Sequence, residues 1–302
     1  MTLRPPREDE FDALLELMNA HQLAAFGEAD YTADDLRTWL TTPYVDVERD
    51  IRVLERDDGR LIGYADADPT RDEPPRWWCD VKVDPDADAA EVLAELVAWL
   101  DERARKGRLR VWTSETDLRI VDAFSRLGFE PLRHSYRMEI DLAGDAREAI
   151  WPDGISVRPA TADDHRAVYE ASVEVWRDTN DPMDDTFDEW VHWHVERDSY
   201  DPSLWLLAHA GGELAGFSLC RPDPVDPNAG YVSLLGVRRP WRRRGLGEAL
   251  LLASFEAFRA HGFTRGTLGV DASSVTGATR LYERAGMRVY RDTVFLERPV
   301  RG

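Results

Sequence analysis

The segment YVSLLGVRRPWRRRGLGEALL, residues 231–251, contains a strand, a turn and the start of a helix. The apolar stretch that ends at Val237 predicts a β-strand. Gly245 and Gly247 then open a segment whose apolar residues recur at helical spacing. Such glycines let successive backbone N–H groups point at one spot, and a helix N-terminus adds partial positive charge. We therefore interpret the turn as a site for phosphate oxygens, and five guanidinium groups suited to phosphate surround it: Arg238, Arg239, Arg242, Arg243 and Arg244.

Two well-known phosphate-binding patterns do not fit this turn. No Gly-Lys-Ser/Thr follows it, which excludes a P-loop. The dinucleotide fingerprint G-x-G-x-x-G is also excluded, because Leu250 stands where its last glycine would be. Two other interpretations stay open: an ordinary strand–turn–helix with solvated arginines, and a nucleic-acid patch, which the charge of the chain disfavours.

The chain has 302 residues and a formal net charge of −20 at pH 7. A protein this acidic binds nucleic acid and anionic lipid poorly but accepts a cationic substrate such as an amine, and solubility alone also explains the charge. The apolar stretches are too short for a membrane span, and the N-terminus lacks the apolar core of a secretory signal. Cys79 and Cys220 are too few for a disulfide framework or a multi-cysteine metal site. We therefore expect a cytoplasmic protein.

An internal repeat with a long period organises the whole chain. Three pairs of motifs carry it, in the same order and at nearly constant offset: LRPPREDEFDALLEL and VRPATADDHRAVYEA, DDGRLIGY and AGGELAGF, and FSRLGFEPLR and YERAGMRVYR. One chance match is easy to find, but three in order indicate a duplication.

Each half predicts the same succession of elements. A short strand is followed by two helices, two strands joined at a glycine turn, a further strand and a long amphipathic helix (residues 89–106 and 245–261). A strand, a short helix and a final pair of strands complete each half. This succession indicates an α/β fold with a mixed sheet, made twice. We predict domains at 1–142 and 155–302, joined by a polar linker at 143–154 that ends in a Pro-Asp-Gly turn.

The arginine-rich segment resembles motif A of the GNAT superfamily of N-acetyltransferases, in which Arg-x-x-Gly-x-Gly follows a Leu-x-Val strand. Downstream, LGVDASSVTGATRLYERAGM, residues 268–287, resembles motif B, whose usual form is Asn-x-x-x-Ala-x-x-Leu-Tyr-x-x-x-Gly-Phe. The N-terminal half is linked to the family through the repeat alone. The layout is similar to that of tandem acetyltransferases of the mycothiol synthase-like type. It implies two tandem GNAT-like domains, each a mostly antiparallel twisted sheet flanked by helices.

The resemblance also implies roles for individual residues. Backbone amides of the strand end 235–237 would line the acetyl thioester, and residues 242–248 would hold the pyrophosphate of acetyl-CoA. Tyr282 falls on the family tyrosine that protonates the departing CoA thiolate, with core packing as the alternative. The implied cofactor-binding residues are Leu235, Gly236, Val237, Arg242, Arg243, Arg244, Gly245, Leu246, Gly247, Glu248, Ser274 and Ala278.

Two features depart from the family pattern. Ser274 stands where motif B has the asparagine that contacts the pantetheine arm, and a serine has a shorter reach. The family often places a glutamate on the strand before the loop, where this chain offers Tyr231 and Ser233. The general base is therefore not identified, and the acidic segment 174–185 is our candidate substrate-binding loop. Candidate bases around the first two helices of this half are Glu174, Asp178, Asp181, Asp185, Glu189 and His194.

The N-terminal half lacks the glycine turn and the tyrosine that the C-terminal half has. Its strand 81–83 runs into DPDADAAEV, where Asp84, Asp86 and Asp88 would repel a pyrophosphate. Two like charges about 4 Å apart repel by about 4 kcal/mol at a surface-like dielectric. Phe124 occupies the position that corresponds to Tyr282. We interpret this half as a degenerate copy.

Together these observations predict an N-acetyltransferase that moves an acetyl group from acetyl-CoA to the primary amine of a small molecule. The attack would be direct, because no Cys or Ser is set beside a His for a covalent route. A non-catalytic acetyl-CoA-binding regulatory module is the alternative, and a longer-chain acyltransferase or a protein N-terminal acetylase is a third interpretation. We expect acetyl-CoA as cosubstrate and no metal, nucleic-acid or membrane partner. The acceptor and the oligomeric state are not readable from the sequence.

Overall fold

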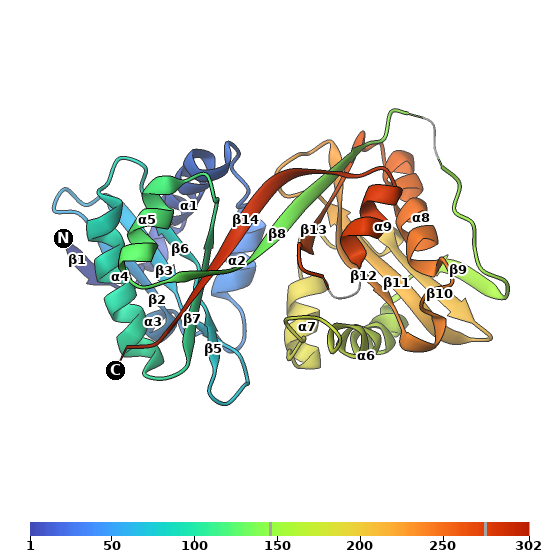
Figure 1. Cartoon of the computed structure of the whole chain (residues 1–302), viewed down its shortest axis with the longest axis horizontal. Coiled ribbons are helices and arrows are strands. Elements are labelled where there is room, and N and C mark those ends of the chain that lie inside the picture. The colour runs from blue at the N-terminus through green and yellow to red at the C-terminus, as the bar shows by residue number, and fades with distance from the viewer. Residues whose placement is uncertain (145–146, 275–276, 302) are drawn as a thin grey trace. The chain divides into compact units, whose positions relative to one another are not determined.

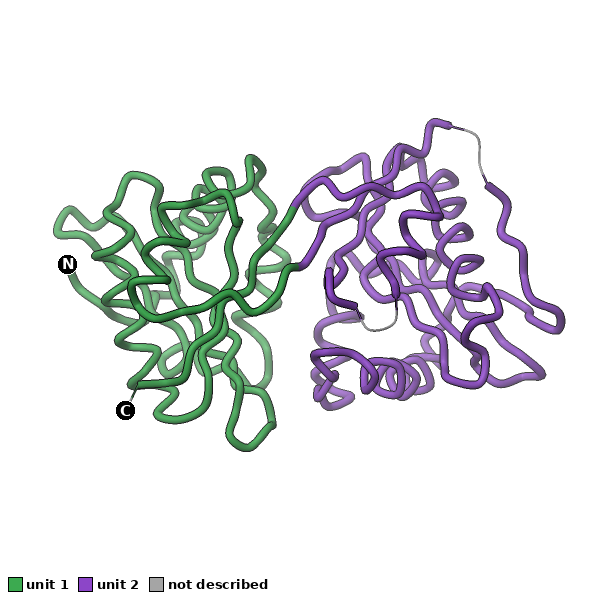
Figure 2. Tube along the Cα trace, in the orientation of Figure 1, with its two compact units in different colours: residues 1–134, 292–302 green, residues 135–291 purple. Residues whose placement is uncertain are grey.

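The computed structural model describes residues 1–144, 147–274 and 277–301. These residues form two compact units (Figure 2). Unit 1 comprises Met1–His134 and Asp292–Gly302, and unit 2 comprises Ser135–Arg291. Each unit combines helices with mostly antiparallel strands, so the predicted α/β class is confirmed in both copies.

Unit 2 is built on a sheet in the order β8-β13-β12-β11-β10-β9. Neighbouring strands are antiparallel except β12 and β13, which run parallel. The elements in chain order, labelled as in Figure 1, are β9 (Ile155–Pro159), α6 (His165–Trp176), α7 (Phe187–His194), β10 (Trp205–Ala210), β11 (Glu213–Pro222), β12 (Ala229–Val237), α8 (Leu246–Ala260), β13 (Arg265–Asp271), α9 (Ala278–Arg284) and β14 (Arg288–Pro299).

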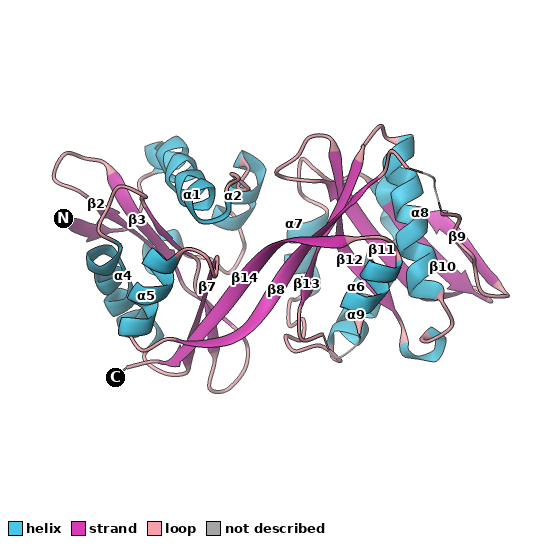
Figure 3. Cartoon of the chain, turned by 45° about the horizontal axis from the view of Figure 1, so that its top comes forward, coloured by secondary structure: helices cyan, strands magenta, loops and turns pink. Residues whose placement is uncertain are grey.

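Helices cover both faces of this sheet (Figure 3). On one face α8 buries Leu251, Phe255 and Phe258 together with residues of α9. On the other face α6 and α7 pack on β10 and β11, where Trp190 and Phe217 are fully buried. Burying one side of each amphipathic helix in this way fixes both layers around the sheet.

Local sequence sets where these helices begin. Thr186 caps α7: its hydroxyl accepts from the Glu189 N–H, and the Glu189 carboxylate accepts from the Thr186 N–H at 2.6 Å. This reciprocal capping box satisfies two N–H groups that the first helical turn leaves without partners. Gly245 precedes α8 with φ of +86°, a left-handed conformation that a glycine adopts without strain.

Unit 1 repeats the plan. Its strands fall into two sets, β1-β2-β3-β6 and β4-β5-β7-β14, in which β5 and β7 are parallel. Helices α1 and α2 pack on β2 and β3, and α4 and α5 pack on the opposite face. The elements are β1 (Thr2–Arg4), α1 (Phe11–Phe26), α2 (Ala33–Leu40), α3 (Val47–Asp50), β2 (Ile51–Glu55), β3 (Leu61–Asp66), β4 (Asp68–Pro69), β5 (Arg76–Trp78), β6 (Val81–Val83), α4 (Ala89–Ala104), β7 (Arg108–Thr113), α5 (Leu118–Arg126) and β8 (Glu130–Asp141).

The last strand of each sequence half completes the unit of the other half. Residues 135–141 of β8 pair with β13 in unit 2, and residues 294–299 of β14 pair with β7 in unit 1. The compact units therefore differ from the contiguous ranges 1–142 and 155–302 expected from the sequence. The reason is physical: β8 and β14 are copies of one strand, so either can satisfy the same sheet edge.

Candidate functional site

The central strands of unit 2 separate at one end. β12 pairs with β13 over Ala229–Val232 alone, although β13 continues to Asp271. At this point Ser233 is an extra residue in β12, because Val232 faces Cys220 and Leu234 faces Leu219. A bulge of this kind bends a strand and re-aims its backbone. Within the described residues, no strand covers the β13 side of residues 233–237, so their N–H and C=O groups form an edge inside the sheet.

Two glycines border this opening, and each has a close neighbour. At Gly236 a Cβ atom would lie 2.4 Å from the Phe217 ring, so any side chain there would displace a buried aromatic. On the facing strand, a Cβ at Gly269 would lie 3.4 Å from the Tyr231 hydroxyl. Leu235 and Val237, which the sequence places at the thioester, are half-buried although they lie in the middle of the sheet.

The predicted phosphate turn presents free backbone N–H groups. Within the described chain, the N–H groups of Gly245, Leu246, Gly247 and Glu248 donate to no protein acceptor. They belong to the cap and first turn of α8, where helical N–H groups lack internal partners and the helix dipole favours an anion. Gly247 has a packing reason as well: a Cβ there would lie 3.2 Å from Leu281 and 3.6 Å from Val237.

Three of the five arginines around the turn are held by acids of α6 and the residues that follow it. Arg238 Nε lies 2.7 Å from Glu174. Arg239 and Arg242 both bind Asp178, at 2.5 and 2.6 Å, and together they hold the pKa of that carboxyl well below its usual range. Arg242 also donates to the Val237 carbonyl at 2.9 Å. The sequence did not predict these pairings, which brace the turn against the candidate substrate-binding segment.

The remaining predicted phosphate ligands differ in how they are held. Arg243 and Arg244 are exposed, and within the described chain neither makes an ion pair. Glu248 is linked to Arg147 at 2.8 Å and lies 3.9 Å from Arg284. The free cations beside the helix N-terminus are therefore Arg243 and Arg244, while Arg242 is already engaged.

Tyr282 lies on α9 and packs in the core that α8 and α9 share. Its side chain is 8% exposed, and burial, followed by the neighbouring Tyr231, raises its pKa to about 12. Such a hydroxyl keeps its proton at neutral pH and can donate a hydrogen bond to a negatively charged atom. Within the described residues it has no hydrogen-bond partner. Packing and a proton-donor role are therefore compatible rather than alternatives.

Ser274 lies at the mouth of the same opening. Its N–H donates to the Asp271 carbonyl at 3.0 Å, and its carbonyl accepts from the Gly277 N–H at 3.1 Å. Val275, beside it in the motif, lies outside the described residues. Asn180, from the candidate substrate-binding segment, donates to Asp271 at 2.9 Å. That segment thus contacts both the phosphate turn and the loop between β13 and α9.

Comparisons with known proteins agree with this geometry. The model of the acetyltransferase (GNAT) family matches residues 165–287, and that of an acetyltransferase (GNAT) domain matches residues 1–130. A mycothiol acetyltransferase of Thermomonospora curvata is 30% identical over 252 residues, covering 82% of this chain and 82% of that protein. The chain belongs to the GNAT family of acetyltransferases.

Further relatives extend the match to both GNAT domains. A mycothiol acetyltransferase of Actinosynnema mirum is 29% identical over 248 residues, covering 80% of this chain and 82% of that protein. A GCN5-related N-acetyltransferase from Sphaerobacter thermophilus has a TM-score of 0.78 at 28% identity, covering 100% of this chain and 96% of that chain. A tandem GNAT protein from the clavulanic acid biosynthesis pathway has the same fold, with a TM-score of 0.76 at 17% identity over 100% and 99% of the two chains. The predictions of a tandem GNAT fold and of an N-acetyltransferase are confirmed.

The GNAT domain of unit 1 has its opening filled. In the strand register, Lys82 pairs with Tyr64 as Gly236 pairs with Phe217, so Lys82 corresponds to Gly236. By the same comparison Trp112 corresponds to Gly269. Lys82 is 1% exposed, its ammonium lies 2.6 Å from Asp80, and it stands 5.8 Å from the Trp112 ring centroid. Unit 1 therefore has large side chains at the two positions where unit 2 has glycines.

In unit 1, protein side chains also bind the backbone groups that correspond to the strand end and the helix N-terminus of the site in unit 2. His21 Nδ1 lies 3.2 Å from both the N–H and the carbonyl of Val83, the counterpart of Val237. The Asp88 side chain accepts from the N–H groups of Ala90 and Glu91, so the first turn of α4 is capped by a carboxylate. The predicted degeneracy of this half therefore extends beyond its acidic loop. Of these residues, Lys82, Trp112 and His21 gave no recognisable signal in the sequence.

The candidate bases suggested by the sequence are mostly engaged elsewhere. Glu174 and Asp178 hold arginines, and Glu189 caps its own helix. His194 packs against Trp190, and burial, followed by Arg197 and Arg221, lowers its pKa to about 3. These four side chains are therefore poorly suited to take a proton from an amine at neutral pH.

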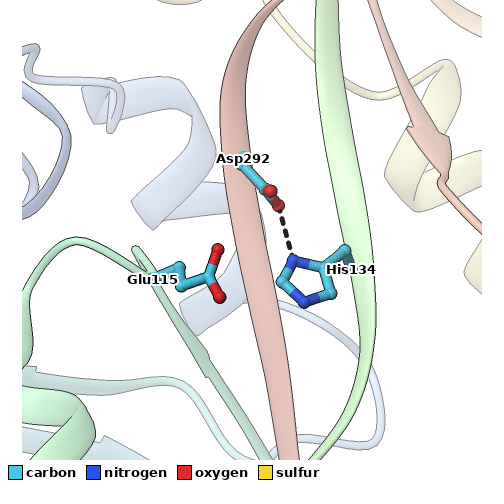
Figure 4. Close-up of side chains that lie close together, drawn as sticks. All are labelled: Glu115, His134 and Asp292. Carbon is cyan, nitrogen blue, oxygen red and sulfur yellow. Dashed lines mark hydrogen bonds and ion pairs between the residues drawn. The ribbon is translucent and has the colours of Figure 1, made fainter.

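One cluster of metal-ligand types occurs in unit 1. Glu115, His134 and Asp292 turn toward one another (Figure 4), with one ligand atom of each lying within 4.8 Å of the others. His134 Nδ1 lies 2.9 Å from Asp292. This ion pair joins equivalent positions of the repeat, since 134 and 292 differ by the same offset as Gly128 and Gly286. Among the described residues, nothing else points to an ion there. No helix among the described residues is long and apolar enough to span a membrane.

Proposed function

We propose that unit 2 transfers the acetyl group of acetyl-CoA to the primary amine of a small molecule by direct attack in a ternary complex. The observation that carries the proposal is the unpaired edge of β12 at residues 233–237. This strand leads into the start of α8, whose first N–H groups have no acceptor within the described residues, and Leu281, next to Tyr282, lies 3.2 Å from where a Cβ of Gly247 would stand.

The residues of unit 2 fit acetyl-CoA in three ways. The N–H groups of residues 245–248, with Arg243 and Arg244, match a pyrophosphate in charge and geometry. On the side away from β11, backbone groups of residues 233–237 other than the Val237 carbonyl can hydrogen-bond an amide-containing arm as a neighbouring strand would. The glycines at 236 and 269 place no side chain of their own beside that backbone.

The chemistry then follows from the placement of these groups. The neutral amine nitrogen attacks the thioester carbonyl carbon, forming the C–N bond, and N–H groups of β12 stabilise the oxyanion as charge builds on the carbonyl oxygen. The C–S bond breaks, and the proton of the Tyr282 hydroxyl goes to the departing thiolate. The nitrogen loses one proton to solvent and the Tyr282 phenolate takes one proton back from solvent, so the step balances and the hydroxyl is restored.

We further propose that acetyl-CoA binds once per chain. In unit 1, Lys82, Trp112 and His21 occupy the equivalent opening, and Asp88 caps the equivalent helix. Entry of acetyl-CoA there would require moving a buried ion pair, which is strongly unfavourable when its partner charge stays behind.

The experiment that tests the function is a panel of amines with thiol release from acetyl-CoA as the readout. The panel includes mycothiol-related acceptors, because curated relatives are mycothiol acetyltransferases. Amine-dependent thiol release with a stoichiometric acetamide product supports the proposal. Tight binding of acetyl-CoA with no turnover on any amine would contradict it.

A further inference from the structure

A cavity of about 510 Å³ lies in unit 2, bordered by α8, the end of α9 and the ends of β8, β13 and β14. Its volume is in the range of small-molecule sites in proteins. From α8 it is lined by Leu252, Phe255 and Arg259, which recur at helical spacing and therefore share one face of the helix. Within the described residues, the lining includes none of those that we assign to acetyl-CoA, so this cavity is separate from the opening between β12 and β13.

Part of the lining is apolar. Leu252 and Phe255 are buried, and so is Ala285 at the end of α9. Ile140 of β8 also lines the cavity and packs against the same core. An apolar wall of this kind favours a ligand with a hydrocarbon or aromatic part, because contact with the wall removes apolar surface from water.

Charged side chains form much of the remaining lining, and arginines outnumber acids there. Four guanidinium groups accompany two carboxylates, in a chain whose formal net charge is −20. The arginines are Arg147, Arg259, Arg265 and Arg288, and the acids are Glu139 and Asp141. The cavity is therefore locally positive in an acidic protein, which favours an anionic ligand.

Two of these arginines retain N–H donors. Arg259 is half-buried and its Nε donates to the Leu142 carbonyl at 2.9 Å. Within the described residues, Arg259 makes no ion pair and its two terminal nitrogens have no protein acceptor. Arg288 donates to Glu139 from Nε and Nη2, at 3.1 and 2.8 Å, which leaves its Nη1 without an acceptor in the described chain.

The other charged groups of the lining are held in place. Glu139 binds Arg265 at 3.1 Å as well as Arg288, so two cations neutralise this carboxylate. Arg265 also binds Asp226 at 2.7 Å. Arg147 binds Glu248 at 2.8 Å and donates to the Arg284 carbonyl. These pairs brace the cavity and leave Arg259 as the main guanidinium available to a ligand.

We propose that this cavity binds a small organic anion, with its oxyanion on Arg259 and Arg288 and its apolar part against Leu252 and Phe255. The terminal nitrogens of Arg259 present paired N–H donors, a geometry that matches two oxygens of a carboxylate or a phosphate. These two groups share the chemistry that the cavity recognises, and the experiment distinguishes them. The inference concerns a second binding site and does not depend on acetyl transfer.

The test measures calorimetric binding of matched aromatic probes to the full chain. Benzoate is compared with benzamide, and phenyl phosphate with phenol. We expect the anionic member of one pair to bind at least about tenfold more tightly than its neutral analogue, and that pair identifies the oxyanion. Each titration is repeated at a saturating concentration of acetyl-CoA, because the N–H groups at the start of α8 can also accept a phosphate.

Variants then assign the binding to the cavity. Arg259→Gln should weaken binding of the preferred anion about tenfold or more, because it removes the charge and the paired donors. Arg288→Gln should have a smaller effect in the same direction, and it leaves Glu139 paired with Arg265. Arg126→Gln, on the exposed face of α5, is the control with the same change in net charge and should bind as the parent protein does. Thermal melting of all three variants shows whether they are folded.

The outcomes decide the inference either way. Binding that persists with acetyl-CoA present and is weakened in Arg259→Gln supports it. No binding of any probe, or equal affinities for the anionic and neutral members of both pairs, would overturn it. Displacement of the anion by acetyl-CoA would overturn it as well, because the anion would then occupy the acetyl-CoA site. If Arg259→Gln melts far below the parent protein, Arg288→Gln decides in its place, and parent-like binding by that variant counts against the cavity.

Discussion

Replacing Gly245 by aspartate should abolish useful acetyl-CoA binding while leaving the fold intact. Gly245 has φ of +86°, and outside its own chain neighbours and helix a Cβ atom there would meet no heavy atom of the described residues within 4 Å. Steric clash is therefore absent, and the structural cost is the left-handed conformation alone, about 1–2 kcal/mol for a residue with a side chain. Against a typical stability of roughly 5–15 kcal/mol, the protein should remain folded.

The effect on binding is much larger. The new carboxylate would stand among the free N–H groups of residues 245–248, where we place the pyrophosphate. Two like charges about 4 Å apart at a surface-like dielectric repel by about 4 kcal/mol. Since about 1.4 kcal/mol is a factor of ten, and salt screens part of the repulsion, affinity should fall by about 10²–10³-fold.

Gly245→Ala is the matched control, because it has the same backbone strain and no charge. Calorimetry with acetyl-CoA, together with thermal melting of both variants, separates strain from charge. The alanine variant should bind within a few-fold of the parent protein, and both variants should melt only a few degrees lower. An aspartate variant that binds acetyl-CoA normally and melts normally would remove this turn from the binding site.

Three further predictions concern the acid, the number of sites and the pH dependence of stability. Tyr282→Phe should lower kcat and kcat/KM together by about 10²–10⁴-fold while the dissociation constant of acetyl-CoA is retained; a variant as fast as the parent would make Tyr282 a packing residue. Calorimetry should give one acetyl-CoA per chain, and two equivalent sites would contradict our account of the filled opening in unit 1. Burial, with Lys82 nearby, lowers the pKa of His21 to about 3 from an unfolded value near 6.5. The contribution of neutral His21 to the free energy of unfolding is complete above about pH 6.5 and is lost as pH falls toward 3, by up to about 1.4 kcal/mol per pH unit. Urea unfolding at pH 7.5 and 5 should therefore show that His21→Gln loses less stability between these two pH values than the parent protein does. Equal losses in the two proteins would rule out His21 as the cause.

The sequence predicted the parts of the site that depend on local backbone chemistry. Gly245 stands out because a glycine adopts its left-handed φ most easily, and a Cβ at Gly247 would crowd Leu281 at 3.2 Å. Tyr282 was singled out through the motif around it, and the roles of all three stay predictions. The duplication predicted a second copy of the fold, which the structure and the family matches confirm. Each of these signals lies within a short stretch of chain, where spacing and residue type suffice.

Features that depend on distant contacts could not be predicted. The pairing of Arg239 and Arg242 with Asp178 joins a turn to residues more than sixty positions earlier, and no pattern in either segment indicates it. The sequence also does not predict that β8 and β14 each complete the unit of the other half, and the reason is different. Both strands descend from one repeat unit and carry equivalent patterns, so the sequence does not say which copy completes which sheet.

The two units together form an internal control for the site. They share the strand register around the opening, yet one presents Gly236 and Gly269 where the other has Lys82 and Trp112. If the fold itself required a side chain at these positions, unit 2 could not have glycines there. If the fold required glycines there, unit 1 could not have large side chains. Packing accounts for Gly236, because the Phe217 ring lies where its Cβ would stand. Gly269 is exposed, and its Cβ would only touch the Tyr231 hydroxyl at 3.4 Å, so packing does not demand a glycine there. A ligand that enters between β12 and β13 is our proposed reason for Gly269, and this proposal depends on neither the motif nor any relative.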